Sequence, residues 1–301
     1  MTGFSSDWLA LREPADGAAR SPALVAAVAA FGSGANALRI LDLGAGTGST
    51  LRALSPHLPA AQHWTLVDHD GSLVAAGRQI LATWSATMIG GAGTGRVSTP
   101  AETPPASGGG LSLHVLSLHV GTMPVDVSWR QADLARADWA ALLEGVDLVT
   151  ASALFDLVSA AFIEIFADAV ATAGAAVYVA LDVDGTSTWS PPHPDDAAVA
   201  DAFRRHQGID KGFGPALGPD ASGVLATALA ARGYTVRTEK SPWRLGPEHA
   251  ALIAELAEGW AGAARAAGLE EAVAARWLAD RRTAAGCVIG HTDLFATPPR
   301  R

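Results

Sequence analysis

The sequence predicts a single α/β domain built on a doubly wound, mostly parallel sheet of seven strands. Strand-like and helical segments alternate along most of the chain, which is the pattern of a sheet with helices on both faces. The first predicted strand runs into a glycine-rich turn, and 49% of the 301 residues are hydrophobic. Ligands of such sheets bind beyond the carboxyl ends of the strands, so residues that follow each strand are the first candidates for a site.

The predicted strands are short segments rich in β-branched and aliphatic residues. They lie at 38–43, 64–67, 125–130, 146–150, 175–183, 234–239 and 287–297. Apolar residues at helical spacing predict helices between most of them. These helices lie at 50–54, 72–85, 135–143, 162–171 and 221–231.

The turn after the first strand is the most informative segment. Residues 40–48 read Ile-Leu-Asp-Leu-Gly-Ala-Gly-Thr-Gly. Glycines at the end of a strand permit a sharp turn and a closer backbone approach to a ligand than a Cβ atom would allow. The same five letters recur at 91–95, without a preceding acidic residue and shortly before Pro100. We therefore interpret the second copy as a flexible loop and the first as a ligand-binding loop.

Two nucleotide motifs fit the first loop poorly. A phosphate-binding P-loop needs a lysine, and Gly48 is followed by Ser49 and Thr50. The dinucleotide fingerprint would place its third glycine at position 49, where this chain has Ser49. This mismatch disfavours a nicotinamide cofactor. Residues 38–50 instead resemble class I S-adenosylmethionine-dependent methyltransferases, whose acidic-x-Gly-x-Gly-x-Gly loop is matched by Asp42, Gly44, Gly46 and Gly48.

The resemblance extends over about residues 38–185 and implies S-adenosylmethionine as the cofactor. Ala45 and Thr47 would line it together with the glycines, and Asp42 would hold its amino group. Asp68 ends the next strand, twenty residues after Gly48, where a carboxylate is expected to bind the ribose hydroxyls.

Five further residues are candidates for the predicted cofactor site. Asp133 and Leu134 resemble the family's adenine contact, which we favour for Asp133 over a role as cap of the helix that begins at Ala135. Ser152 follows the fourth strand, and either Arg20 or Arg12 would pair with the methionine carboxylate.

Candidate catalytic residues follow later strands. They are Asp156, His206, Asp210 and Lys211, the last three in a polar stretch that a solvated helix end would also explain. Phe155 is either a contact of the sulfonium or a core aromatic.

Other polar residues suit the interior of the fold better than chemistry. Asp182 and Asp184 lack a third carboxylate for a metal, so no metal is expected. His291 and Asp293 are expected to form hydrogen bonds in the core, and Cys287 to be buried.

The remaining segments predict the organisation around this core. Residues 1–36 would form an N-terminal helical cap and 37–185 the cofactor-binding core, with the last two strands within 232–246 and 286–297. The segments 186–219 and 247–282 would cap the acceptor pocket, the second as a helical insertion before the last strand or as a homodimer interface. The stretch 88–124 is expected to be a surface hairpin or ribbon.

Composition restricts the partners. A net charge of −9 disfavours nucleic acid, because binding of that polyanion relies on Lys and Arg. No apolar run approaches 18 residues and no signal peptide is recognisable, so we expect a cytoplasmic protein without a membrane span. The predicted function is methyl transfer to a small molecule. The alternatives are a nicotinamide-dependent oxidoreductase and a catalytically inactive binding protein.

Overall fold

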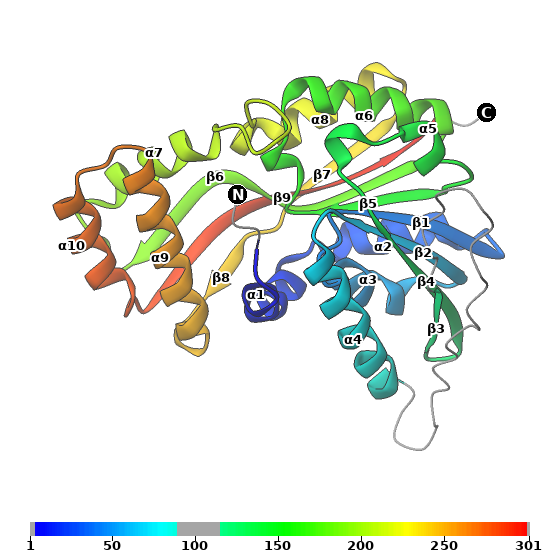
Figure 1. Ribbon diagram of the computed structural model, residues 1–301, viewed down its shortest axis with the longest axis horizontal. Coiled ribbons are helices and arrows are strands. Elements are labelled where there is room, and N and C mark those ends of the chain that lie inside the picture. The colour runs from blue at the N-terminus through cyan, green and yellow to red at the C-terminus, as the bar shows by residue number, and fades with distance from the viewer. Residues whose placement is uncertain (1–3, 89–114, 300–301) are drawn as a thin grey trace.

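The computed structural model describes residues 4–88 and 115–299, and within them nine strands form one mixed sheet (Figure 1). The strands are ordered β3-β4-β2-β1-β5-β6-β9-β7, and β8 pairs with β9. Their bounds are β1 Ala37–Leu43, β2 Ala61–Asp68, β3 Val115–Val120, β4 Met123–Gln131, β5 Leu148–Ser152, β6 Ala176–Ser190, β7 Thr235–Lys240, β8 Trp243–Leu245 and β9 Gly286–Thr297.

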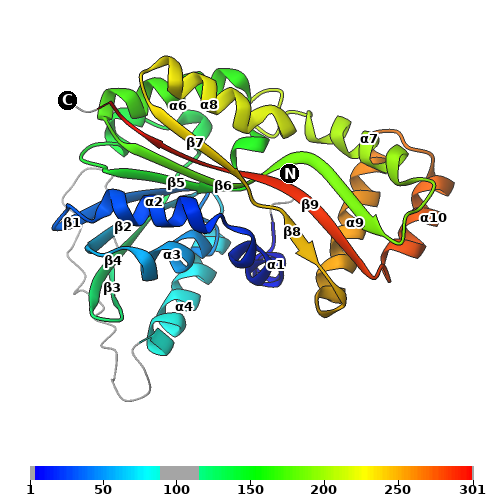
Figure 2. The same cartoon turned by 180° about the vertical axis from the view of Figure 1, so that it is seen from behind.

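Helices cover both faces of the sheet, as the alternating pattern predicts. Those among the described residues are α1 Ser6–Ala19, α2 Pro22–Gly32, α3 Ser49–Leu54, α4 Gly71–Met88, α5 Trp139–Leu142, α6 Ala160–Ala173, α7 Asp196–Gln207, α8 Ala221–Ala231, α9 Ala250–Ala266 and α10 Glu271–Arg281. Helices α5, α6 and α8 lie on one face, and α2, α3 and α4 lie on the other (Figures 1 and 2). None of these helices combines the length and the apolar character that a membrane span requires.

The central strands β4, β2, β1, β5 and β6 run parallel to one another. A parallel sheet is covered on both faces, so its strands are apolar on both sides. In β1, for example, Ile40, Leu41 and Leu43 are all buried. The α/β class and the parallel centre are therefore confirmed.

The predicted count of seven strands is wrong. The additional strand β3 forms an antiparallel hairpin with β4, and β8 is a short additional partner of β9. β8 has only three residues, and both additional strands are held by backbone pairing to a longer strand. Residues 89–114, with the second glycine motif, lie outside the described residues.

Strand β6 is much longer than the predicted 175–183. It continues to Ser190 because antiparallel β9 pairs with it along most of that length, past two irregularities at Val179/Asp182 and Val183/Ser187. The predicted cap 186–219 therefore begins as strand and continues as α7. Bulges of this kind redirect side chains and are common beside active sites.

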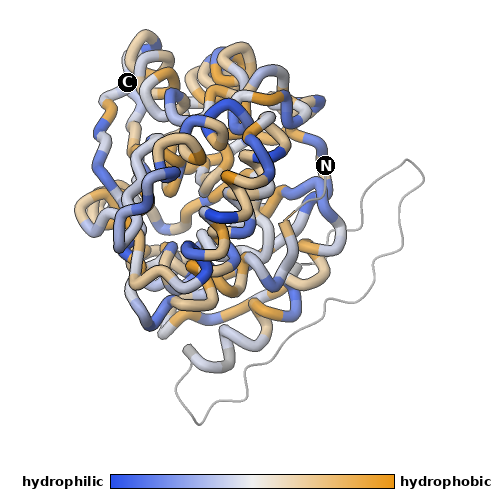
Figure 3. The backbone as a smooth tube through the Cα atoms, turned by 90° about the vertical axis from the view of Figure 1, so that its left-hand side faces the viewer, coloured by the Kyte–Doolittle hydropathy of each residue, from blue (hydrophilic) through white to orange (hydrophobic). Residues whose placement is uncertain are grey.

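The extended ends of β6 and β9, with β8, carry a second lobe. Helices α7, α9 and α10 pack there around a separate hydrophobic core that contains Trp189, Trp243, Trp260 and Trp277. Seen from this side, hydrophobic and hydrophilic stretches alternate along the chain, as expected for helices that bury one face (Figure 3). Helices α9 and α10 do precede the last strand, while their description as an insertion stays a prediction.

Candidate functional site

The glycine loop joins β1 to α3 in a conformation that its glycines make possible. Gly44, Gly46 and Gly48 all have positive φ, at 61°, 53° and 84°. Side chains would be strained there, and they would also collide: a Cβ atom on Gly46 would lie 3.0 Å from the side chain of Leu9 in α1. Helix α1 therefore packs directly on the loop.

Asp68 shapes this loop from the end of β2. Its Oδ2 accepts a hydrogen bond from the Gly46 amide at 2.8 Å, and its Oδ1 accepts one from the Asp70 amide at 2.9 Å. Each carboxylate oxygen has two lone pairs, so Asp68 can still accept from the hydroxyls of a ligand. Its predicted role at a ribose stays a prediction that this geometry permits.

Asp42 is fully buried beneath the loop. Thr150 on β5 donates to its Oδ1 at 2.7 Å, and Oδ2 has no partner among the described residues. Burial raises the pKa of Asp42 to about 7, against the opposing effects of the Thr150 hydrogen bond and the Arg20 charge. The carboxyl is thus poised to ionise when a positive group approaches.

Arg20 lies just beyond α1 and is 5% exposed. Its Nη2 donates to Ser152 Oγ at 2.9 Å, and Thr50 lies 3.0 Å from the same hydroxyl. Within the described chain, Nε and Nη1 of Arg20 have no hydrogen-bond partner and no carboxylate pairs with the guanidinium. A buried guanidinium in this state is suited to an anionic group of a ligand.

Arg12, the alternative to Arg20, is already paired. It forms a bidentate contact with Asp16, at 2.8 and 3.1 Å, and lies over the ring of Trp243. Glu13, the next residue of α1, pairs with Arg52, whose Nη1 donates to the carbonyl of Thr47 in the loop at 2.7 Å. The Glu13–Arg52 pair links α1 to the loop, and the pairing of Arg12 with Asp16 leaves Arg20 as the better candidate for a ligand contact.

A second group of buried acids lies after β5. Asp156, in the 3-10 turn η3 (Phe155–Leu157), is 7% exposed and its Oδ1 has no partner among the described residues. Burial raises the pKa of Asp156 to about 6, and the charge of Arg12 opposes this. Burial and the nearby Asp156 together raise the pKa of Asp182, whose Oδ1 accepts from the Phe155 amide at 3.1 Å.

The backbone is strained at the same place. Ala153 and Leu181 are the non-glycine residues with positive φ in the described chain, at 52° and 63°. Such conformations cost about 1 to 3 kcal/mol and cluster at functional sites. The Ala153 amide donates to the carbonyl of Ala180, so the two strained segments support each other.

His291 and Asp293 project from β9 into the interior, where both are buried. Asp293 accepts from the amides of Ser21 and Leu181, at 2.8 and 2.9 Å, and from the hydroxyl of Ser241. The expected core hydrogen bonding is confirmed for Asp293. The side chain of His291 instead lies beside Trp243, with ring centroids 5.1 Å apart, and its Nδ1 has no partner in the described structure.

The other predicted catalytic residues gather at the end of α7. Lys211 donates to the carbonyl of His206 at 3.2 Å, and Asp210 accepts from the amides of Gly212 and Gly214. Among the described residues, no hydrogen bond or ion pair joins these three to Asp156. Burial and the Lys211 charge lower the pKa of His206. Their contacts organise a loop, and a catalytic role stays a prediction.

Several other predictions can be compared with the geometry. Asp133 caps η2 (Leu134–Arg136) by accepting from the Ala135 amide at 2.9 Å, while Leu134 is buried. Phe155 is fully buried against Phe166, which makes it a core aromatic. Cys287 is buried as expected.

The two aspartates considered for a metal serve other partners. Asp184 accepts from Lys240 and Thr186, whereas Asp182 supports η3. In the described chain, no group of three or more His, Cys, Asp or Glu side chains is placed to hold a metal ion.

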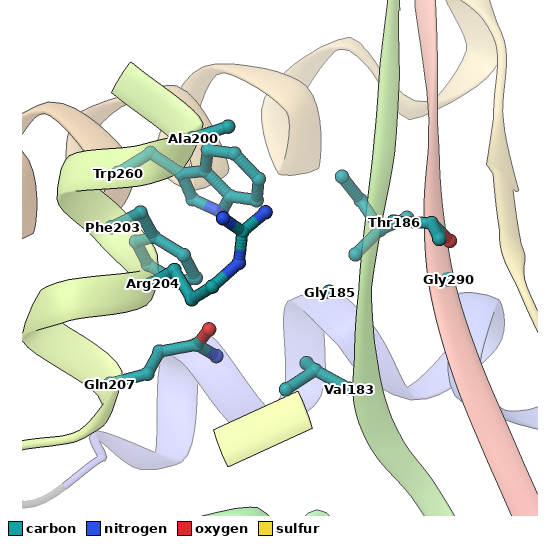
Figure 4. A pocket seen from close by; sticks show the side chains of 10 residues that line it. Val183, Gly185, Thr186, Ala200, Phe203, Arg204, Gln207, Trp260 and Gly290 are labelled. Atoms are coloured by element: carbon teal, nitrogen blue, oxygen red, sulfur yellow. The ribbon is translucent and has the colours of Figure 1, made fainter. Parts of the chain in front are cut away.

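The two predicted cap segments meet in the second lobe. A cavity between β6, α7 and α9 is lined by Val183, Thr186, Phe203 and Trp260, with Arg204 and Gln207 pointing into it from α7 (Figure 4). The space open to the centre of a water molecule is about 20 Å³, which suffices for about one water. This cavity is too small for an acceptor.

Sequence reasoning missed the residues that complete the site by long-range contact. Thr50 lies within hydrogen-bond distance of the Ser152 hydroxyl, and Thr150 donates to Asp42. Trp243 lies against Arg12 and His291. Thr50 begins the predicted helix 50–54, and Thr150 ends the predicted strand 146–150. These positions could therefore have marked both residues as candidates for the site. Trp243 carried no such signal.

Comparison with known proteins gives the fold class. Neither a protein family model nor a curated sequence matches the chain. Among solved structures, a cyclopropane-fatty-acyl-phospholipid synthase-like protein from Lactobacillus casei is 15% identical with a TM-score of 0.50, over 98% of this chain and 94% of that one. The cyclopropane synthase MmaA2 from Mycobacterium tuberculosis is 14% identical with a TM-score of 0.47, over 98% and 95%.

The likeness to the first structure shows the fold and nothing finer. Together with the parallel centre, the antiparallel β9 between β6 and β7, and the glycine loop after β1, it confirms the expected class. The chain has the class I methyltransferase fold.

Proposed function

We propose that this protein is an S-adenosylmethionine-dependent methyltransferase that acts on a small-molecule acceptor. The observation that carries the proposal is a pair of complementary groups beside the glycine loop, each with polar atoms that no described residue satisfies. The Arg20 guanidinium has free N–H groups, and the Asp42 carboxyl has a free oxygen among the described residues. The methionine end of the cofactor carries one carboxylate and one ammonium group, which match Arg20 and Asp42 in number and sign.

The remaining predicted contacts fit the same ligand. The backbone of 44–48 would pass close to the ribose and methionine parts, with Asp68 at the ribose hydroxyls and the Asp133–Leu134 segment at the adenine. The bound cofactor supplies an activated methyl group. The residues of the chain therefore need to bind and align the reactants, which contributes on the order of 7 to 11 kcal/mol.

Asp156 is the residue best placed to handle a proton of the acceptor. It is buried after β5, has a free oxygen, and follows Leu154, which packs against Gly44 of the loop. His206, Asp210 and Lys211 remain further candidates at the end of α7.

The cofactor assignment is tested by isothermal titration calorimetry with S-adenosylhomocysteine and with NADH. We expect binding of the first alone. Arg20→Gln should weaken that binding about 30-fold or more, because loss of one partner of a buried charge pair costs about 2 to 5 kcal/mol. Arg237→Gln, at an exposed position of β7, is the matched control and should bind as the wild type does. Binding of NADH alone would overturn the proposal in favour of an oxidoreductase.

Catalysis is tested separately from binding. The protein is incubated with methyl-labelled S-adenosylmethionine and a small-molecule extract, and labelled products are separated by chromatography. A labelled product supports the enzyme, whereas binding of S-adenosylhomocysteine without any labelled product across a broad extract favours a binding protein.

A further inference from the structure

Strand β7 forms one edge of the sheet. Among the described residues it pairs with β9 alone, and Figure 2 shows it running beside that strand. Five of its six residues are exposed, and the sixth, Val236, is half-buried. An unpaired edge presents a row of backbone N–H and C=O groups, which is a template for a strand of another chain. The strand that covers this edge must match β7 in its backbone groups and in its charges.

The pairing with β9 fixes which backbone groups of β7 face the open edge. Ser241 directly follows β7 in the same register, and its amide donates to the carbonyl of His291 on β9 at 3.0 Å. Backbone groups alternate in direction along an antiparallel strand, so every second residue before Ser241 also faces β9. The residues between them, Val236, Thr238 and Lys240, therefore direct their N–H and C=O groups to the open edge.

The charges of β7 make the strand complementary to itself. Arg237 and Glu239 flank Thr238, are exposed, and form no ion pair or side-chain hydrogen bond among the described residues. If two copies of β7 pair antiparallel about a two-fold axis at Thr238, each Arg237 lies opposite Glu239 of the second copy. These are non-hydrogen-bonded positions, where Cα atoms are about 4.5 Å apart and side chains are closest. Opposite charges and paired threonines in such positions stabilise a ladder.

The other symmetric registers lack this match. An axis at Arg237 or at Glu239 would place two like charges directly opposite each other, which destabilises a ladder. An axis at Lys240 would do the same with two lysines, and an axis at Val236 would place neither charge opposite its counterpart. Among these registers, the axis at Thr238 alone pairs each arginine with a glutamate.

The helices beside β7 are suited to the approach of a second copy. Helices α2 and α8 contact β7 and lie on opposite faces of the sheet. Neither helix contains a charged residue. Many of their exposed positions are small, among them Ala23, Ala26, Ala30, Gly223 and Ala230. Pairing of two β7 edges would therefore bury no unpaired charge from the two helices.

We propose that the protein forms a homodimer in which β7 pairs antiparallel with β7 of a second copy, with Thr238 opposite Thr238. Such an interface is isologous, so each copy contributes the same residues and the assembly closes at two chains. Outward backbone groups of Val236, Thr238 and Lys240 join the two sheets, and two Arg237–Glu239 ion pairs fix the register. The inference is independent of the proposed function, because three strands separate β7 from β1 and its glycine loop.

The test measures the dissociation constant of the dimer by sedimentation velocity, at protein concentrations from about 1 μM to about 1 mM. Arg237→Glu places two glutamate pairs in the interface, and Glu239→Arg places two arginine pairs there. We expect each variant to weaken the dimer about tenfold or more. Arg205→Glu on α7 and Glu255→Arg on α9 make the same changes at exposed positions and should dimerise as the wild type does.

An equimolar mixture of the two single variants checks the register. In a heterodimer of Arg237→Glu with Glu239→Arg, each glutamate lies opposite an arginine. The mixture should therefore recover a dissociation constant within about threefold of the wild-type value. The double variant R237E/E239R should recover it in the same way, as a homodimer.

A backbone variant checks the hydrogen bonds of the open edge. Thr238→Pro removes an outward N–H group at a position where an edge strand tolerates proline, and it should weaken the dimer about tenfold or more. Thr238→Ala keeps the N–H group and is the matched control. Circular dichroism checks that each variant is folded, and the charge variants test the same interface if Thr238→Pro is not.

The outcomes decide the proposal. A wild-type protein that stays monomeric over the whole concentration range would overturn it. A dimer that none of the β7 variants weakens would also overturn it and would move the interface elsewhere, for example to the segment 247–282. A dimer that both single variants weaken, but that their mixture does not recover, would contradict the Thr238 register. Binding of S-adenosylhomocysteine should be the same in every variant, so its absence would count against the proposed function and not against the dimer.

Discussion

The glycine-loop side of the site and the residues around Trp243 bury polar groups in different ways. On the loop side, hydrogen-bond partners lie in the central strands or directly after them: Asp68 accepts from the amides of Gly46 and Asp70, and Asp42 accepts from Thr150 on an adjacent strand. Around Trp243, three separate elements, α1, β8 and β9, supply one residue each, namely Arg12, Trp243 and His291.

This difference has a physical origin. The loop needs particular backbone angles over five residues, and only glycine adopts them cheaply. The group around Trp243 needs side chains to converge from α1, β8 and β9, which are far apart in the sequence. The first requirement leaves a motif in the sequence, and the second leaves scattered single residues.

Loss of Asp293 should break both regions at once and have the largest effect. This carboxylate accepts from Ser21, next to Arg20, and from Leu181 and Ser241. Asp293→Ala would leave two buried amides without partners, so we expect the free energy of unfolding to fall by about 3 to 5 kcal/mol. Urea denaturation followed by circular dichroism measures it, with Asp201→Ala as the exposed control. A decrease in the free energy of unfolding below about 1 kcal/mol would show that the contacts of Asp293 contribute little to stability.

Ionisation of Asp42, on the loop side, should make the free energy of unfolding depend on pH. Burial raises the pKa from 3.8 to about 7, so the folded protein binds this proton more strongly than the unfolded chain does. The contribution of Asp42 to the free energy of unfolding therefore falls as pH rises from about 4 to about 7, and it is constant above that. In Asp42→Asn this contribution is absent, so the variant should gain stability relative to wild type between pH 5 and pH 8.

The same ionisation should govern cofactor affinity. Binding of S-adenosylhomocysteine to wild type should tighten by up to about tenfold per pH unit as pH rises toward about 7 and level off above it, because the ionised carboxyl attracts the ligand's ammonium group. Thermal unfolding and calorimetry over pH 5 to 8 measure both effects. Parallel pH profiles for wild type and Asp42→Asn would contradict this prediction.

The ion pair between Glu13 and Arg52 should have the smallest effect, because it only links α1 to the loop. The Glu13 side chain is 33% exposed, and pairs in such positions contribute about 0.2 to 1 kcal/mol. Glu13→Gln should therefore weaken binding of S-adenosylhomocysteine about two- to fivefold, with Glu239→Gln on β7 as the control. A double-mutant cycle with Arg52→Gln isolates the pair, and a coupling energy of zero would mean that α1 is held by apolar packing alone.

Much of the fold followed from local patterns. Alternation of apolar strands and helices predicted the α/β class, and Gly44, Gly46 and Gly48 predicted the turn after β1, which the structure has with positive φ at each glycine. The strand count was not predictable in the same way. β3 and β8 exist because a longer partner pairs with their backbones, and β6 reaches Ser190 because β9 runs beside it.

The sequence by itself determined the class of fold and the place of the cofactor loop, because hydrophobic periodicity and glycine conformation act over a few residues. Tertiary structure makes Arg20 a better candidate than Arg12, since Arg12 pairs with Asp16 while Arg20 keeps free N–H groups in the described structure. It also placed His291 beside Trp243. Burial, charge pairing and pKa depend on which distant residues pack together, and that is set only when the whole chain has folded.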